Sequence, residues 1–322
     1  MKTRLLTSFG IVFVLALAFV LKIYVSNYFF DALILAIACV SAYELSKMFT
    51  KMGRYNDKVM ACIFPIIAMT ILLIGVHGDE NLGLLFTIGL TALFIVFCFG
   101  ITFVIPLVMY KSTLNEIKAR GMKGKAVLKY SLVKALNTTV IFVYPAFLVI
   151  FLSLINHFED MTTTFAGVTG YNGWLSFYLL LFAFLIPIFT DTFAYLVGGA
   201  IGGKKLAPKI SPKKTISGAV GGFVFAILLN IVVFLIFDAV PSMSLMLSST
   251  GITVWKVALI AGIGSVISEL GDLFESYLKR TSGVKDSGNF LPGHGGMLDR
   301  FDSYIFLAPY LFIAFSIILT LI

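Results

Sequence analysis

The sequence has few charged residues and few cysteines. Only 12% of its 322 residues are charged and 59% are hydrophobic, whereas a soluble domain has about 25% charged and about 45–50% apolar residues. These proportions exclude a soluble enzyme and a disordered chain. The three cysteines each stand inside an apolar run, which excludes both a disulfide framework and metal-ligand spacing. With a mean hydropathy of +1.01, the chain is expected to be a polytopic integral membrane protein.

Apolar runs of spanning length recur along the chain. A membrane helix needs about 20 apolar residues, and the runs predict an all-α protein with about nine spans. They lie near 5–21, 28–46, 59–77, 82–110, 136–156, 173–200, 216–237, 255–277 and 303–322. The first run lacks a small-x-small cleavage site and a second span follows at once, which favours a retained anchor over a signal peptide.

Basic residues lie almost entirely on one side of these spans. With nine spans, all but Lys22 and Lys256 of the 24 Lys and Arg residues fall on the side of the N-terminus. The positive-inside rule therefore predicts a cytoplasmic N-terminus and an external C-terminus. The basic segment 111–134 is expected to be a solvated loop attracted to anionic lipid rather than a catalytic element. Because the basic residues form no compact domain, the net charge of +8 predicts no nucleic-acid partner.

The chain divides into two regions by its polar residues. Residues 1–135 carry about four spans and the basic loop, and residues 136–322 carry about five spans. Nearly all of the unusual polar residues lie in the second region. We therefore expect the second region to be the catalytic one.

Carboxylates recur at helical spacing in the second region. Glu269, Asp272 and Glu275 are three residues apart in an apolar run, so they share one helix face. Asp299 and Asp302 repeat this spacing where the last span begins. Carboxylates are costly in a bilayer, and clusters of oxygen ligands suit hard cations such as Mg²⁺. The spacing favours a metal site over the alternative, simple pairing with neighbouring basic residues.

Two further segments have compositions suited to phosphate. Residues 210–215, ISPKKT, place hydroxyls, a proline and two lysines before a predicted helix start, where a phosphate can bind. His294 stands in PGHGG, whose glycines let backbone N–H groups approach a ligand. A P-loop is excluded, because Lys205 replaces the Ser or Thr after the G-x4-G-K run that ends at Lys204 and no strand precedes it.

Four segments together resemble a family signature. These are SYLKR at 276–280, GVKDSG at 283–288, PGHGG at 292–296 and LDRFDS at 298–303. They resemble the signature of phosphatidate cytidylyltransferases (CDP-diacylglycerol synthases), which here extends over 276–303. The pairs Asp191-Thr192 and Ala194-Tyr195, and the ISPKKT segment with Gly218, also match. The sequence departs from the family pattern in two places. Glycines within 198–203 stand where the family usually has a basic motif, and Ser217 stands where it usually has a glutamate.

The resemblance implies a chemistry and a set of residues. It implies transfer of CMP from CTP to phosphatidic acid, which forms CDP-diacylglycerol and pyrophosphate in phospholipid biosynthesis. The metal residues of the family map onto Asp272, Asp299 and Asp302, so Mg²⁺ is expected and a second cation stays open. Catalytic roles are expected for Asp272, Asp299, Asp302, Lys279, Arg280 and His294. Substrate contacts are expected from Ser211, Lys213, Lys214, Thr215, Lys285, Asp286, Arg300 and Asp191.

The resemblance also implies a homodimer in a bacterial cell membrane, with the active site at the cytoplasmic face. Two alternatives stay open. A related CTP-dependent enzyme acting on another lipid phosphate, such as an archaeal ether lipid, would share these motifs. A secondary transporter also has carboxylates within the membrane, but the polar groups here gather at one predicted membrane face, which favours the enzyme.

Overall fold

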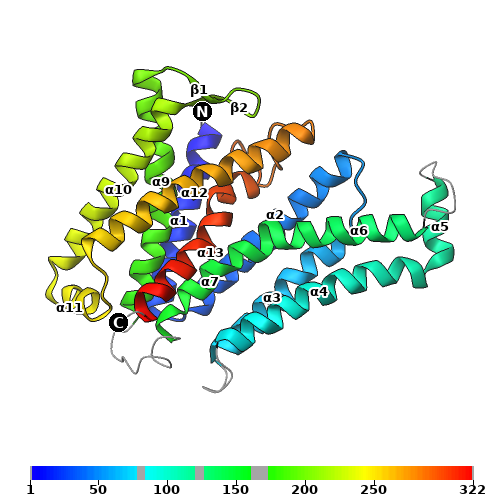
Figure 1. The fold of residues 1–322 in the computed structure, drawn as a ribbon, viewed down its shortest axis with the longest axis horizontal. Coiled ribbons are helices and arrows are strands. Elements are labelled where there is room, and N and C mark those ends of the chain that lie inside the picture. Colours follow the sequence, from blue (N-terminus) through cyan, green and yellow to red (C-terminus); the bar gives the residue numbers. More distant parts are fainter. Residues whose placement is uncertain (1, 78–83, 120–126, 161–172, 321–322) are drawn as a thin grey trace.

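The structure is a computed structural model that describes residues 2–77, 84–119, 127–160 and 173–320 (Figure 1). Within these residues the regular secondary structure is helical except for one short β-hairpin and an isolated β-bridge between Leu291 and Gly295. The helices are α1 (Lys2–Tyr24), α2 (Tyr28–Lys51), α3 (Lys58–His77), α4 (Leu84–Val108), α5 (Tyr110–Ala119), α6 (Val127–Ile141), the π-helical η3 (Phe142–Phe147), α7 (Leu148–Asn156), α9 (Trp174–Ile201), α10 (Ile216–Asp238), α11 (Pro241–Ser249), α12 (Val254–Thr281) and α13 (Leu298–Thr320); the strands are β1 (Lys205–Ala207) and β2 (Ser211–Thr215).

Nine helical segments in the described part of the chain are long and apolar enough to cross a membrane. This confirms the predicted all-α membrane class. The fifth segment begins earlier than predicted, because α6, η3 and α7 run together from Val127 to Asn156. Lys134, which the sequence placed in a loop, is therefore helical, and its Nζ lies 3.2 Å from Asp57 Oδ2. The expected boundary at residue 135 falls inside α6.

The last span also begins earlier than predicted, at Leu298 instead of 303. Asp299 and Asp302 therefore lie in its first turns. The basic segment 111–134 contains α5 and the start of α6. Residues 120–126 of this segment lie outside the described residues, so its predicted role in attracting lipid stays a prediction.

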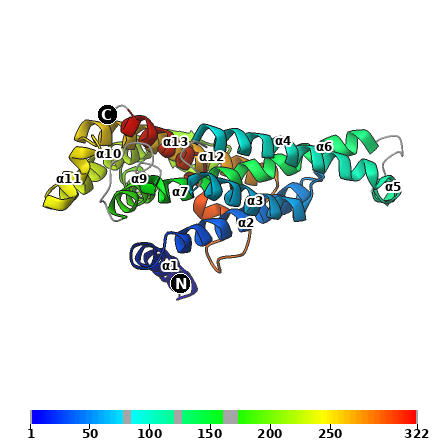
Figure 2. The same ribbon diagram turned by 90° about the horizontal axis from the view of Figure 1, so that it is seen from below.

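Helix α1 lies apart from the layer that the other spans form (Figure 2). Only 11% of its apolar stretch is buried, against 67% for the span 127–156. Hydrogen bonds hold α1 near both ends. The Thr7 hydroxyl donates to the Pro292 carbonyl at 2.8 Å, and Lys22 Nζ donates to the Asn156 carbonyl at 3.2 Å. α1 is therefore attached at its ends and only lightly packed between them.

Helices α9 and α10 approach each other closely through glycine. A Cβ at Gly218 would lie 2.6 Å from the Ala194 carbonyl oxygen, and one at Gly222 would lie 2.6 Å from that of Thr190. Between these helices the chain forms the antiparallel β1–β2 hairpin. Thr215 ends β2 and caps α10, because its Oγ1 accepts from the Gly218 N–H at 3.1 Å. The hairpin thus lies at the same end of the molecule as the N-terminus, and the C-terminus lies at the other end (Figure 1).

Candidate active site

A cavity of about 500 Å³ lies beside the β1–β2 hairpin. Helix α9, the hairpin, the start of α10 and helix α12 form its wall. Its charged and hydroxyl-bearing lining residues include Asp191, Lys213, Lys214, Thr215, Glu269 and Asp272. We call this space the hairpin cavity. It brings together five of the predicted site residues, and Glu269, which the sequence placed only on the acidic helix face, joins them.

Lys214 and Asp272 form an ion pair at the wall of the hairpin cavity. Lys214 Nζ lies 2.7 Å from Asp272 Oδ2, and the two side chains are 22% and 25% exposed. Burial alone would lower the pKa of Lys214, but the nearby Asp272 carboxylate outweighs burial and raises it. Lys214 therefore carries its charge at neutral pH and remains accessible to an anionic ligand in the cavity.

Several carboxylates gather at this wall together with three lysines, Lys205, Lys213 and Lys214. Asp191, Glu269 and Asp272 line the cavity, and Asp302 lies within electrostatic range of Asp191 and Asp272. Gly271 permits this approach, because a Cβ there would lie 2.7 Å from the Asp302 carbonyl oxygen. In the part of the chain that the structure describes, no three carboxylate, histidine or cysteine side chains gather tightly enough to hold a metal alone.

These oxygen donors are nevertheless suited to bind Mg²⁺ in the way that enzymes acting on nucleotides bind it. In such enzymes one or two carboxylates bind the ion and substrate phosphates complete its coordination. Asp272 and Asp302 fit this arrangement, because Asp272 borders the cavity and Asp302 lies within electrostatic range of it. In this structure Asp272 Oδ2 pairs with Lys214 and its Oδ1 accepts from the Ser276 hydroxyl at 3.2 Å, and Asp302 Oδ1 accepts from the Ser303 N–H at 2.7 Å.

Asp299, the third expected metal residue, is instead held by the loop between α12 and α13. Its Oδ1 accepts from Lys279 Nζ at 2.7 Å. Its Oδ2 accepts from the Ser287 N–H and hydroxyl, both at 2.9 Å, and from the Gly296 N–H at 2.7 Å. Both oxygens are thus occupied by protein donors. In this structure Asp299 therefore shapes the loop, and its expected role as a metal ligand stays a prediction.

Glu44 of α2 holds the same loop, and the sequence analysis missed it. Its carboxylate accepts from the N–H groups of Met297 and Leu298 at 3.1 and 2.9 Å and from the Ser287 hydroxyl at 3.3 Å. The side chain is buried. A carboxylate in the interior of an apolar span was the available signal, because such a group normally has a function or a partner.

A second cavity of about 500 Å³ lies at this loop, and we call it the loop pocket. Its polar lining residues include Lys285, Asp286, Asn289, His294 and Arg300. Arg300 donates through Nε and Nη2 to the His294 carbonyl, at 3.1 and 2.8 Å. Arg300 is also within electrostatic range of Asp191 at the hairpin cavity. The structure therefore divides the predicted residues between two neighbouring polar cavities.

Five predicted residues line neither cavity: Asp299 and Asp302, described above, and three more. Lys279 is paired with Glu275 and Asp299, and Arg280 Nε donates to the Ile210 carbonyl at 3.2 Å. Ser211 begins β2 and is paired with Ala207 in the hairpin. These contacts join α12 to the loop and to the hairpin, so the three residues support the cavity walls in this structure.

Ser217, the departure from the family pattern, also has a structural partner. Its hydroxyl donates to the Gly202 carbonyl at the end of α9. The serine therefore connects the start of α10 to the turn before the hairpin, in a region where the usual glutamate would place a carboxylate beside a carbonyl oxygen.

Comparison with known proteins identifies the family of the chain. The model of the cytidylyltransferase family matches residues 2–318, so the chain belongs to this family. Proteins named phosphatidate cytidylyltransferase are similar to it over 132 residues: those of Staphylococcus saprophyticus and Staphylococcus aureus (strain COL) are 46% identical, and that of Staphylococcus epidermidis (strain RP62A) is 47% identical. The matched region covers 41% of this chain and 46% of each relative, so the chain spans about half the length of the curated relatives it matches.

Proposed function

We propose that this protein transfers CMP from CTP to phosphatidic acid, forming CDP-diacylglycerol and pyrophosphate. The observation that carries the proposal is the hairpin cavity, where lysines of the hairpin face several carboxylates at one end of a membrane bundle. Membership of the cytidylyltransferase family and the names of the relatives support the same activity.

The reaction requires little proton transfer. A phosphate monoester has a second pKa near ~6, so the phosphatidic acid phosphate is largely dianionic near neutral pH. One of its oxygens attacks the α-phosphorus of CTP. The bond from that phosphorus to the oxygen bridging to the β-phosphate breaks, and pyrophosphate leaves with this oxygen and its electron pair. The main task of the protein is therefore to bring anions together and neutralise them.

The residues of the two cavities suit this task. Lys213 and Lys214 line the hairpin cavity and would neutralise the triphosphate of CTP. Asp272 and Asp302 would hold Mg²⁺, which when bound would neutralise charge on the phosphates. Arg300, within electrostatic range of Asp191, would hold phosphate oxygens on the side of the loop pocket.

The proposed setting is a bacterial cell membrane with both cavities at the cytoplasmic face. CTP is available there, and the positive-inside rule supports this orientation. A homodimer is part of the proposal on family resemblance alone.

Purified protein in detergent with radiolabelled CTP, phosphatidic acid and Mg²⁺ tests the activity. We expect a labelled lipid-soluble product and free pyrophosphate. Lys214→Ala should reduce turnover about 100-fold, because removal of one group that neutralises transition-state charge has this size of effect. Lys209→Ala is the matched control, since Lys209 lies in the same hairpin but is exposed and lines no part of the hairpin cavity. No labelled lipid from the unaltered protein would contradict the proposal.

A further inference from the structure

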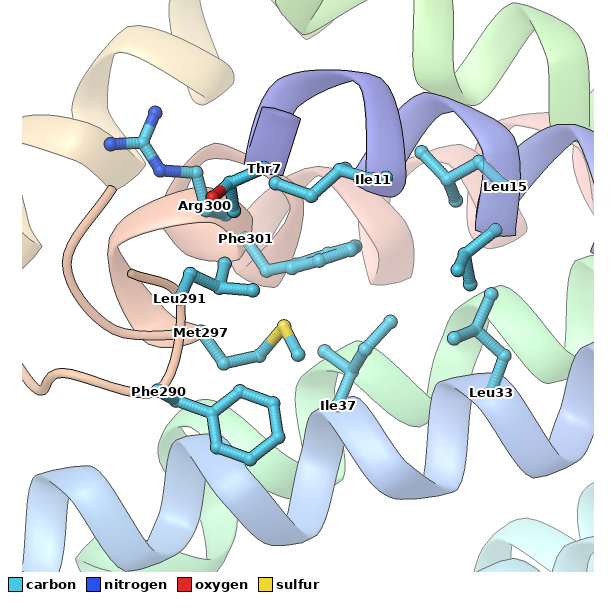
Figure 3. A pocket seen from close by; sticks show the side chains of 12 residues that line it. Thr7, Ile11, Leu15, Leu33, Ile37, Phe290, Leu291, Met297, Arg300 and Phe301 are labelled. Atoms are coloured by element: carbon cyan, nitrogen blue, oxygen red, sulfur yellow. The ribbon is translucent and has the colours of Figure 1, made fainter. Parts of the chain in front are cut away.

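An apolar groove of about 350 Å³ separates the lightly packed α1 from α2 and α13 (Figure 3). Ile11 and Leu15 of α1 face Leu33 and Ile37 of α2 across it, and Phe301 of α13 forms part of its floor (Figure 3). The signature loop and α13 contribute one wall of this groove, but the reaction with CTP described above assigns the groove no role.

The two ends of the groove differ in chemistry. Its inner part is lined by aliphatic and aromatic side chains, whereas Thr7 and Arg300 stand at one end (Figure 3). From Thr7 to Leu15 the groove follows α1 for about 12 Å, at 1.5 Å per residue. This shape suits a hydrocarbon chain with a polar group attached at one end.

The polar end of the groove continues into the loop pocket. Leu291 and Arg300 line both spaces. The Arg300 guanidinium points away from the apolar side chains (Figure 3), and Lys285 is a second basic residue that lines the loop pocket. An anionic group held near Arg300 would therefore be attached directly to a chain lying in the groove.

The contacts of α1 join the groove to the signature loop. Thr7 donates to the Pro292 carbonyl, and Ser8 Oγ lies 2.9 Å from His294 Nε2. Val14 on the groove wall is 47% exposed and Phe290 is 58% exposed. These exposed apolar side chains would face the hydrocarbon of the bilayer, so a lipid chain could enter the groove laterally from the membrane without crossing water.

On the basis of the proposed function, we propose that the groove between α1 and α2 binds one acyl chain of phosphatidic acid and that its phosphate lies in the loop pocket beside Arg300. α1 is then a substrate-binding element rather than only an anchor. The arrangement places the lipid phosphate on the side of Arg300 and the nucleotide on the side of Lys214, with Asp191 within electrostatic range of both cations.

The test is photocrosslinking of the full-length protein in phosphatidylcholine vesicles. The probe is phosphatidic acid with a diazirine in the middle of one acyl chain, and adducts are mapped by peptide mass spectrometry. We expect adducts on residues 10–15 and 33–37. Unlabelled phosphatidic acid should compete with the probe, whereas inorganic phosphate should not.

A matched pair of glycine variants tests occupancy of the groove. Gly10 lines it, and a Cβ at Gly10 would have no neighbour within 4 Å. Gly10→Leu should therefore fit the protein but exclude the chain, lowering adduct yield about tenfold, the effect of keeping roughly two methylenes out of an apolar site. Gly100→Leu, at an equally open position in α4, should leave the yield unchanged.

Three results would overturn the groove proposal. These are adducts confined to other helices, equal adducts on residues 10–15 and 33–37 from a phosphatidylcholine probe with the same chains, or equal yields from the Gly10→Leu and Gly100→Leu variants. Crosslinking needs no CTP, so failure of the groove proposal can be distinguished from failure of the proposed function, which the activity assay tests. Adducts in the groove without labelled product would contradict the proposed transfer, and labelled product with adducts elsewhere would contradict the groove.

Discussion

Asp299 and Asp302 stand three residues apart in α13, but their carboxylates have different surroundings. Asp299 accepts hydrogen bonds through both oxygens from Lys279 and the signature loop. Asp302 lies instead within electrostatic range of Asp191 and Asp272. The same spacing therefore places one carboxylate in a structural role and the other toward the proposed reaction.

This difference predicts that the Asp→Asn substitutions differ in their effect on stability. Asp272→Asn and Asp302→Asn should reduce turnover by about 100-fold or more while preserving thermal stability, because each removes charge from the proposed Mg²⁺ site. Asp299→Asn should also lower the free energy of unfolding by about 2–3 kcal/mol, since it weakens charged hydrogen bonds in a buried cluster. Turnover against Mg²⁺ concentration and thermal unfolding measure the two effects.

Asp238→Asn serves as the control for these variants, because Asp238 is exposed at the opposite end of α10. If Asp299→Asn unfolded at the same temperature as the unaltered protein, the structural role of Asp299 would be wrong. Near-native turnover of Asp302→Asn at an unchanged Mg²⁺ requirement would remove Asp302 from the proposed metal site.

At the scale of elements, the hairpin cavity depends on how closely α9 and α10 approach. Gly218→Ala would place a Cβ 2.6 Å from the Ala194 carbonyl oxygen, so the helices must separate. We expect a loss of about 1–3 kcal/mol, the usual cost of overpacking, together with weaker CTP binding. Thermal unfolding and the KM for CTP test this. Gly100→Ala in α4, which lies outside the hairpin cavity and where a Cβ would meet nothing within 4 Å, should change neither quantity.

His157, which directly follows α7, joins that helix to α2. Its Nε2 lies 2.7 Å from Asp31 Oδ2 in α2, and its Nδ1 lies 2.7 Å from Asp160 Oδ2. Burial alone would lower the pKa of His157, but hydrogen bonds to Asp160 and Asp31 outweigh it and raise the pKa to about 9. The folded protein therefore binds this proton more tightly than the unfolded chain, whose histidine pKa is about 6.5.

The sign of the pH dependence follows from this linkage. The stabilisation from His157 is fully present below about pH 6.5 and is lost as pH rises through about 9, a change of up to about 3 kcal/mol. The melting temperature should therefore fall over this window. His157→Gln should flatten that fall. An equal slope in both proteins would show that other groups cause the pH dependence.

At the scale of the whole molecule, composition and apolar runs were sufficient to predict the membrane class. The segment limits were less predictable, because the helix beginning at Val127 includes Lys129 and Lys134, and Lys134 pairs with Asp57 of another segment. The residues of the two cavities were predictable because they stand in short motifs, each of which can be recognised within a few consecutive residues. Glu44 was not, since its contacts with the loop 253 and 254 residues away exist only after the helices pack.

The orientation of the whole molecule is the remaining prediction. The N-terminus and the hairpin lie at one end and the C-terminus at the other (Figure 1), as an odd number of spans requires. All but two of the basic residues are assigned to the N-terminal side, so this end should be cytoplasmic. A reporter fused after Ile322 should therefore register outside the cell. One inserted near Lys123, in a segment outside the described residues, should register inside. If both reporters lay on the same side, the nine-span topology would be wrong. If both were reversed, the two cavities would face away from the cytoplasmic CTP that the proposed reaction requires.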